Sequence, residues 1–219
     1  MALNKKYYNF GTGLIMFCVI VTVLLWSIML PLPQRFVDTN TILKSIGQLL
    51  GLIGTVLFAL SFVLMTRIKA IEEKFYGLDK MYSIHHILGA LSFIFILFHP
   101  LVLVTRFIPQ DLSYAVEYFI PANYWPINVG IIALYSMILL LALTFFVPIA
   151  YKKWRISHKF LGFVYIIACF HFFVIPSDIT NFAPLYIWMM GLSLFGIGSF
   201  IYGSFLRTMF WWRVSIYNN

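Results

Sequence analysis

The stretch SIHHILGALSFIFILFHPLVLV, from Ser83 to Val104, decides the fold of this 219-residue chain. It is long and apolar enough to cross a bilayer as a helix, yet it contains His85 and His99. An ionisable side chain at bilayer depth is costly and by default marks a functional site facing the bundle interior. Fourteen helical steps separate the two imidazoles by roughly 20 Å and return to within about 40° of the same face. The segment is therefore predicted to bind something at two depths.

The same pattern returns as ISHKFLGFVYIIACFHFFVI, from Ile156 to Ile175. His158, Gly162 and His171 correspond in order to His85, Gly89 and His99. Imidazole is a common axial ligand of haem iron, and two facing helices with histidines at two depths could hold two bis-histidine haems. The gap from His158 to His171 is one residue shorter than its counterpart and falls about 140° short of a full turn. A local widening or a bend is therefore expected in this helix.

The composition excludes a soluble globular domain. Hydrophobic residues make up 62% of the chain and charged residues 10%, whereas soluble domains are nearer roughly 45–50% apolar. The short alternating segments of a membrane barrel are absent from the sequence. The two cysteines, Cys18 and Cys169, stand alone and lack a Cys-x-x-Cys-His motif, which argues against disulfides, iron–sulfur clusters and covalent haem. Any haem is expected to be of the non-covalent b type.

The chain is predicted to be one all-α domain, residues 1–219, forming a bundle of six transmembrane helices. The expected spans are residues 10–31, 42–66, 83–105, 127–149, 156–175 and 184–206. The first is read as a retained helix, because the apolar core of a signal peptide is shorter. The second carries Gly47, Gly51 and Gly54, and small residues let membrane helices approach closely. Residues 67–82 and 107–124 are expected to be a charged connector and an aromatic loop.

The positive charges predict the topology, because Lys and Arg concentrate in cytoplasmic loops. With both termini cytoplasmic, 12 of the 15 basic residues lie inside, and only Arg35, Lys44 and Arg106 lie outside. Topology thus accounts for the net charge of +8, and a nucleic-acid partner is not expected. The third and fifth spans then run in the same direction, and two stacked haems are expected between them. The protein is expected in the cytoplasmic membrane, surrounded by lipid.

Two features favour His85 over His86 as the inner ligand. The internal repeat aligns His85 with His158. Gly89 and Gly162 each follow the first histidine by four residues, on the same helix face, where a missing side chain would let a porphyrin approach the backbone.

Four cations are candidate partners of haem propionates. Arg155 and Lys159 flank His158 at the predicted inner face, and Lys44 and Arg106 lie at the outer face. Topology alone explains the same charges equally well.

The pattern His-x-x-Leu-Gly followed by a second histidine, on the third and fifth of six spans, resembles the ferric reductase-like transmembrane domain shared by iron reductases and NADPH oxidases. In that family a cytoplasmic flavin, reduced by NADPH or NADH, feeds an inner haem, and an outer haem passes electrons to oxygen or ferric iron. The resemblance implies that His85 and His158 ligate the inner haem, and that His99 and His171 ligate the outer one.

The chain also departs from the family. Leu103 stands where NADPH oxidases have a further histidine near the oxygen site, and Val164 falls where a large aromatic often lies between the haems. Residues 213–217 resemble the start of a flavin-domain strand, but no glycine-rich nucleotide motif follows. The FAD or FMN and the NAD(P)H are therefore expected on a missing domain or on a separate flavoprotein.

Three functions compete at this point. The first is an oxidoreductase membrane component that moves electrons outward through two haems. The second is a haem-bearing membrane subunit that passes electrons between a quinone or flavin and a partner reductase. The third, less favoured, is a haem-free transporter or scaffold whose histidines bind a metal or carry protons.

Overall fold

The structure is a computed structural model that describes residues 5–75, 77–109 and 111–207, with side chains from residue 10 onward. Residues 213–217, compared above with a flavin-domain strand, lie outside these ranges, as do the side chains of Lys5 and Lys6.

Within the described residues every regular element is helical, and six segments are long and apolar enough to cross a membrane. The helices that form them are α1 (Lys5–Met29), α3 (Thr39–Met65), α5 (Leu78–Val104), α7 (Trp125–Phe146), α8 (Tyr151–Lys159) with α9 (Leu161–Val174), and α10 (Ala183–Ile201) with the π-helical turn η2 (Tyr202–Leu206). The predicted all-helical, six-span architecture is confirmed, and the chain is an integral, multi-pass membrane protein.

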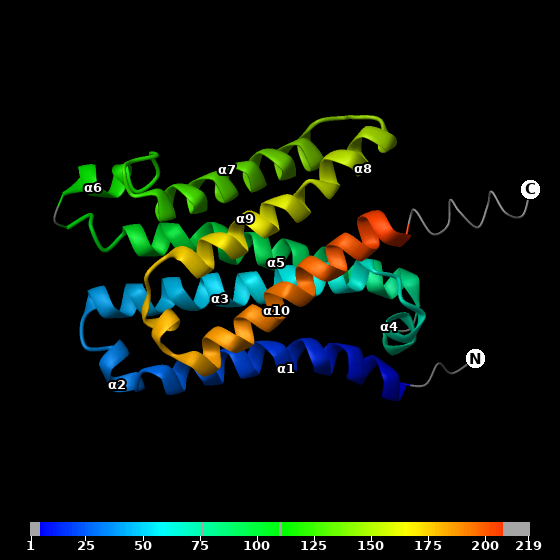
Figure 1. Ribbon diagram of the computed structural model, residues 1–219, viewed down its shortest axis with the longest axis horizontal. Coiled ribbons are helices and arrows are strands. Elements are labelled where there is room, and N and C mark those ends of the chain that lie inside the picture. Colours follow the sequence, from blue (N-terminus) through cyan, green and yellow to red (C-terminus); the bar gives the residue numbers. More distant parts are fainter. Residues whose placement is uncertain (1–4, 76, 110, 208–219) are drawn as a thin grey trace, which may run out of the picture.

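The bundle is elongated, and its long helices lie side by side, roughly along its long axis (Figure 1). Helix α5 packs on α3, α9 packs on α7, and α10 packs on α3 and α1. Helix α5 and the α8–α9 segment run in the same direction (Figure 1). The two histidine-bearing helices are thus each supported from behind by another helix.

Four short helices occupy segments that were expected to be loops. They are α2 (Leu32–Arg35), α4 (Lys69–Lys74), α6 (Leu112–Glu117) and the 3-10 helix η1 (Asp178–Asn181). Helix α5 also begins five residues before the predicted 83, directly after Gly77, whose φ of 96° suits a residue without Cβ. Hydropathy marks where a helix enters lipid, whereas the backbone continues helical into the polar boundary.

The fifth span is interrupted at Phe160, between its two histidines. The Phe160 amide donates to the Ser157 carbonyl at 3.0 Å, and the Phe163 amide donates to the Phe160 carbonyl at 3.0 Å. These are i→i+3 bonds, which tighten a helix and add rotation per residue. The sequence predicted either a widening or a bend in this helix. The helix is interrupted by a tightened turn and is not widened there, because a turn that must recover missing rotation has to tighten.

Three glycines of α3 seat α5 closely against it. A Cβ on Gly54 would lie 2.8 Å from Ile96, and one on Gly47 would lie 2.6 Å from Leu103. The buried Ser92 hydroxyl donates to the Gly54 carbonyl at 3.0 Å. This close approach fixes the rotation of α5 and hence the direction in which its histidines point.

Candidate functional site

The imidazoles of His85 and His158 lie close together, one on α5 and the other on α8. Their ring centroids are 6.1 Å apart, with the planes at 80°. An imidazole nitrogen binds a metal ion at about 2 Å, so two rings on opposite sides of one ion have centroids roughly 6 Å apart. The observed separation therefore fits two axial ligands of a single ion.

Three of the four predicted ligand histidines direct Nδ1 at a backbone carbonyl. The pairs are His85 with Ser61 at 3.1 Å, His99 with Gly47 at 2.7 Å, and His171 with Pro126 at 2.8 Å. A carbonyl oxygen only accepts, so each Nδ1 carries the hydrogen and each Nε2 keeps a free lone pair. Metal-binding histidines are almost always held in this way.

His158 is the exception. Its Nδ1 is buried and has no hydrogen-bond partner among the described residues. Its ring instead stacks on Trp154, with centroids 5.3 Å apart and planes at 12°. Trp154 lies one turn earlier on α8, and the stack sets the plane of the imidazole without fixing its tautomer.

His99 and His171 line one cavity of about 330 Å³, which we call the histidine cavity. Its walls come from α3, α5, α7, α9 and the segment that leads into η1. A volume of this size is within the range of small-ligand sites.

Two glycines make room for these imidazoles. A Cβ on Gly51 of α3 would lie 2.8 Å from Nδ1 of His99, and one on Gly130 of α7 would lie 2.7 Å from Cε1 of His171. At these two positions, α3 and α7 present only backbone to the imidazoles, because any side chain there would displace the ring.

The two glycines singled out by the repeat have different surroundings. A Cβ on Gly89 would meet no atom within 4 Å, so space is open beside it. A Cβ on Gly162 would collide with the ring of Phe200 on α10. Glycine at position 162 is therefore needed for helix packing, and the expected role of Gly162 in admitting a flat ligand is not what this placement favours.

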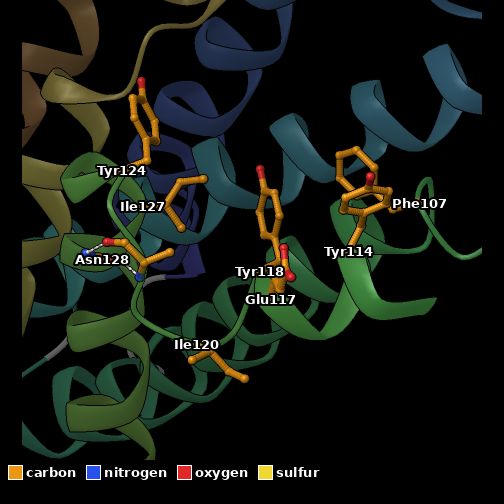
Figure 2. A pocket seen from close by; sticks show the side chains of 9 residues that line it. Phe107, Tyr114, Glu117, Tyr118, Ile120, Tyr124, Ile127 and Asn128 are labelled. Atoms are coloured by element: carbon orange, nitrogen blue, oxygen red, sulfur yellow. Dashed lines mark hydrogen bonds between the residues drawn. The ribbon is translucent and has the colours of Figure 1, made fainter. Parts of the chain in front are cut away.

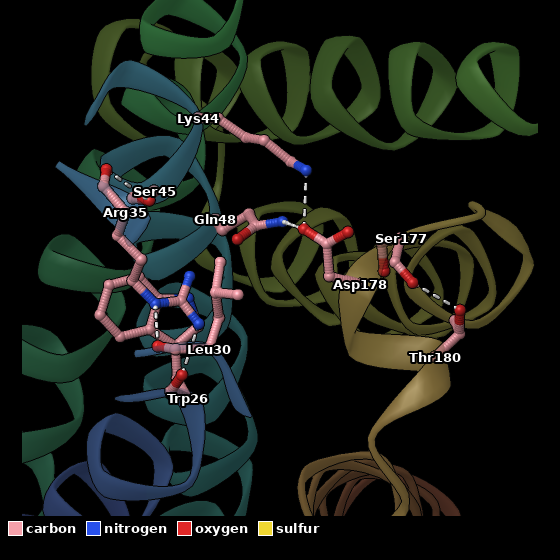
Figure 3. A network of polar contacts seen from close by, with 9 residues as sticks. All are labelled: Trp26, Leu30, Arg35, Lys44, Ser45, Gln48, Ser177, Asp178 and Thr180. Atoms are coloured by element: carbon pink, nitrogen blue, oxygen red, sulfur yellow. Dashed lines mark hydrogen bonds and ion pairs between the residues drawn. The ribbon is translucent and has the colours of Figure 1, made fainter. Parts of the chain in front are cut away.

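Several polar side chains that line the histidine cavity belong to a polar network (Figure 3). Nζ of Lys44 is 2.7 Å from Oδ2 of Asp178, and Nε2 of Gln48 donates to the same oxygen at 3.4 Å. Hydrogen bonding to Lys44 is the main cause that holds the pKa of Asp178 below its ordinary value. Lys44, Arg106 and Asp178 all line the cavity. Two of the predicted propionate partners thus stand where a carboxylate ligand would need them.

The same network anchors the loop between α1 and α3. The buried guanidinium of Arg35 lies 3.8 Å from the centre of the Trp26 ring and donates to the carbonyls of Trp26 and Leu30 at 2.6 and 3.0 Å (Figure 3). These carbonyls end α1 and would otherwise be unpaired.

The predicted inner cations are placed differently. Arg155 is exposed on α8, and Nζ of Lys159 donates to the Ser204 carbonyl at 3.2 Å, toward η2. His86 is exposed next to His85, with ring centroids 5.8 Å apart. The structure pairs His85, rather than His86, with His158.

In the described part of the chain, no three His, Cys, Asp or Glu side chains converge to hold a metal ion. Two imidazoles alone are too few for a stable metal site. The facing pair therefore suits an ion whose other ligands come from a planar macrocycle such as a porphyrin, as in bis-histidine haem.

A family model described as "Ferric reductase like transmembrane component" matches residues 50–169, more than half of the chain. The chain belongs to this family. The match includes His85, His99 and His158 and ends two residues before His171. No curated protein matched the chain in sequence. Membership makes this ferric reductase-like chain an oxidoreductase membrane component with a role in transmembrane electron transfer.

Sequence reasoning missed several residues around the histidines. Asp178 belongs to no motif, although it is an isolated acidic residue three positions after the predicted fifth span. Gly51 was expected only to let helices approach closely, and Gly130 was not singled out, because the histidine repeat gives no register for the helices that pack behind the histidines. The carbonyls of Ser61 and Pro126 leave no trace in side-chain chemistry.

Proposed function

We propose that this ferric reductase-like chain conducts electrons across the cytoplasmic membrane, from a cytoplasmic flavin reduced by NAD(P)H to an acceptor outside such as ferric iron or oxygen. Two b-type haems would supply the one-electron redox chemistry when bound. The observation that carries the proposal is the facing His85–His158 pair at 6.1 Å, repeated at a second depth by two imidazoles that line one cavity.

In this proposal His85 and His158 are the inner axial ligands, and His99 and His171 are the outer ones. The carbonyls of Gly47 and Pro126 hold the outer imidazoles with Nε2 directed away from the backbone. Gly51 and Gly130 leave each ring its space. The surrounding apolar helices keep water from the route.

The distribution of charge supports the proposed orientation. Arg67, Lys69, Lys74, Lys152, Lys153 and Arg155 belong to the end with α4 and α8, whereas Arg35, Lys44 and Arg106 belong to the end with α2 and α6. By the positive-inside tendency the α4–α8 end is cytoplasmic. A flavoprotein domain or subunit would dock there, close to His158.

At the other end Lys44 and Arg106 would pair with haem propionates, since a carboxylate near lipid needs a cationic partner. Asp178 already forms an ion pair with Lys44 in the cavity lining. We infer that Asp178 and the ligand carboxylates share this lysine.

The test uses purified chain in sealed vesicles. Haem-loaded protein should show the sharp reduced bands of low-spin bis-histidine iron, and a reduced flavoprotein added on the α4–α8 face should reduce an acceptor trapped on the other side. Vesicles of the His99→Ala variant are the matched control. A haem-free, colourless preparation after growth with ample haem precursor would overturn the proposal, as would acceptor reduction confined to the side of the donor.

A further inference from the structure

A second cavity, of about 530 Å³, lies beside α6 and is here called the aromatic cavity (Figure 2). Its lining residues are Phe107, Tyr114, Glu117, Tyr118, Ile120, Ala122, Tyr124, Ile127 and Asn128. Tyr118 and Ile127 also line the histidine cavity, so the two spaces share a wall. A ligand in the aromatic cavity would therefore lie beside the cavity that holds the outer histidines.

The lining offers aromatic faces and hydrogen-bond donors. The rings of Phe107 and Tyr118 lie 5.6 Å apart at 32°. The hydroxyls of Tyr114, Tyr118 and Tyr124 make no hydrogen bond to another residue in the described ranges. Burial raises the pKa of the Tyr118 phenol, so that group stays a protonated donor. The complement of such a lining is a flat ring that carries acceptor oxygens.

The other polar groups of the lining point to a neutral ligand. The amide of Asn128 is already committed to the backbone of Ala122, at 2.9 Å and 2.6 Å. Glu117 is the one charged side chain of the nine lining residues. The guanidinium carbon of Arg106 lies 5.3 Å from the centre of the Phe107 ring, but Arg106 is not among the lining residues. An anionic ferric chelate would therefore meet the Glu117 carboxylate in the cavity itself, and dioxygen needs no cavity of this volume.

The cavity is also placed for entry from the membrane. Leu112 and Val116 of α6 are 63% and 51% exposed, and Ile120 just after the helix is 54% exposed. Apolar side chains that are exposed at the end of a membrane bundle suit the lipid interface. An amphiphile dissolved in that leaflet can therefore reach the tyrosines without crossing water.

We propose that the aromatic cavity binds a quinone-class ring as the outer electron acceptor of this chain, with Tyr118 and Tyr124 donating to its oxygens. This assignment rests on the proposed function, because the proposed electron transfer through the chain supplies the electrons that reduce the quinone. One quinone takes up two electrons, delivered singly by the chain, and two protons from water on the outer side. Both carbonyl oxygens become hydroxyls, and the quinol leaves to the lipid.

Binding tests the site without any redox step. Menadione, a tail-less naphthoquinone, and methylnaphthalene, its counterpart without oxygens, are titrated by equilibrium dialysis against the purified full chain in detergent. Menadione should bind saturably, and Tyr118→Phe and Tyr124→Phe should each weaken it roughly threefold to tenfold, the worth of one hydrogen bond. Tyr151→Phe, at the opposite end of the bundle, should bind as the wild type does. Menadione and methylnaphthalene bound alike, or no effect of either tyrosine variant, would overturn the proposal.

Kinetics separates this inference from the proposed function. Chemically reduced, haem-loaded chain is mixed anaerobically with menadione, and reoxidation is followed in the visible spectrum. The rate should saturate with menadione, with a half-saturation concentration raised in the Tyr118→Phe and Tyr124→Phe variants. A rate that rises linearly and is identical in both variants means collision without a site and contradicts the quinone assignment alone. A chain without haem would instead remove the proposed function, and dialysis would still decide whether the aromatic cavity is a binding site.

Discussion

The His99–His171 pair and the His85–His158 pair are built by different means. Both imidazoles of the first pair donate Nδ1 to a backbone carbonyl, and each rests against a glycine of the helix behind it. In the second pair only His85 has such a partner, whereas His158 is held by its stack on Trp154. One site is fixed by backbone, and the other leaves one ligand under side-chain control.

The helices explain this difference. Helices α7 and α9 pack along each other near His171, while His158 sits on α8, a separate segment beyond the turn at Phe160. A ligand on a short segment at the membrane boundary can change its orientation when something docks on that face. We therefore expect the outer site to be rigid and the inner site to be adjustable.

The largest expected effect comes from removing a ligand. His99→Ala or His171→Ala should eliminate the outer haem and leave the inner one, so that the haem-to-protein ratio falls from two to one, because an iron with one protein ligand is held weakly. The ratio is measured by extracted haem against protein concentration. His86→Ala is the matched control and should keep both haems, and retention of both in His99→Ala would contradict the ligand assignment.

Crowding the outer imidazoles should have the next largest effect. Gly51→Ala and Gly130→Ala each place a methyl group under 3 Å from an outer imidazole. The imidazole must then rotate or shift its hydrogen bond to the backbone carbonyl. Loss of such orienting contacts typically weakens metal affinity about 10–100-fold. Haem titration of the haem-free protein measures it, with Gly191→Ala as control because its added methyl meets nothing within 4 Å. Equal haem affinities in all three variants would show that Gly51 and Gly130 do not pack tightly against the outer imidazoles.

The inner site should respond to its stacking partner. Trp154→Leu removes the ring against His158, and a stacked pair contributes about 0.5–1.5 kcal/mol. Inner haem affinity should fall severalfold while the outer site keeps its spectrum. Trp125→Leu, at the other end of the bundle and stacked on Phe170, should leave the inner site unchanged. If Trp154→Leu altered the outer site instead, the two sites would not be independent.

The smallest effect is electrostatic. Asp178→Asn removes a negative charge beside the outer site and releases Lys44, and both changes favour the reduced form there. Because the Lys44–Asp178 pair is half exposed, solvent screens its charges. At a fixed potential, the ratio of oxidised to reduced outer haem should therefore change by only about two- to fivefold. A redox titration that follows both sites measures the shift, and an equal change at the inner site would contradict the local origin.

The pH dependence of this contact follows from the depressed pKa of Asp178. A carboxyl whose folded pKa is lowered stabilises the fold above its ordinary pKa and loses that contribution as pH falls through the folded value. The free energies of unfolding of the wild type and of Asp178→Asn should therefore differ by a constant amount from about pH 5 to pH 8. The difference should vanish only in acid below the ordinary carboxyl range. A difference that changes near pH 6.5 would implicate a histidine instead.

Much of the architecture was predictable because lipid imposes simple rules. Spans of apolar residues were sufficient to expect six helices. The repeat of His85–His99 in His158–His171 indicated that the two segments are counterparts, although their histidine gaps are 14 and 13 residues. The pairing of His85 with His158 follows from two helices that run in the same direction.

The remainder depends on where loops and supporting helices come to rest. Asp178 reaches Lys44 only because η1 folds back over the cavity, which no local pattern encodes. Gly162 resembles Gly89 in the repeat, yet it packs against Phe200 of a helix that the repeat does not describe. The 13-residue gap from His158 to His171 showed that the helix must depart from regular rotation. Only the backbone of the structure shows that it does so by tightening at Phe160.

The most direct test of the account is a potentiometric titration of the purified chain, followed by visible and paramagnetic resonance spectra. We predict two low-spin, bis-histidine centres per chain that titrate as separate one-electron steps, with only the outer one missing in His171→Ala. A single centre in the wild type, or two centres that both persist in His171→Ala, would contradict it.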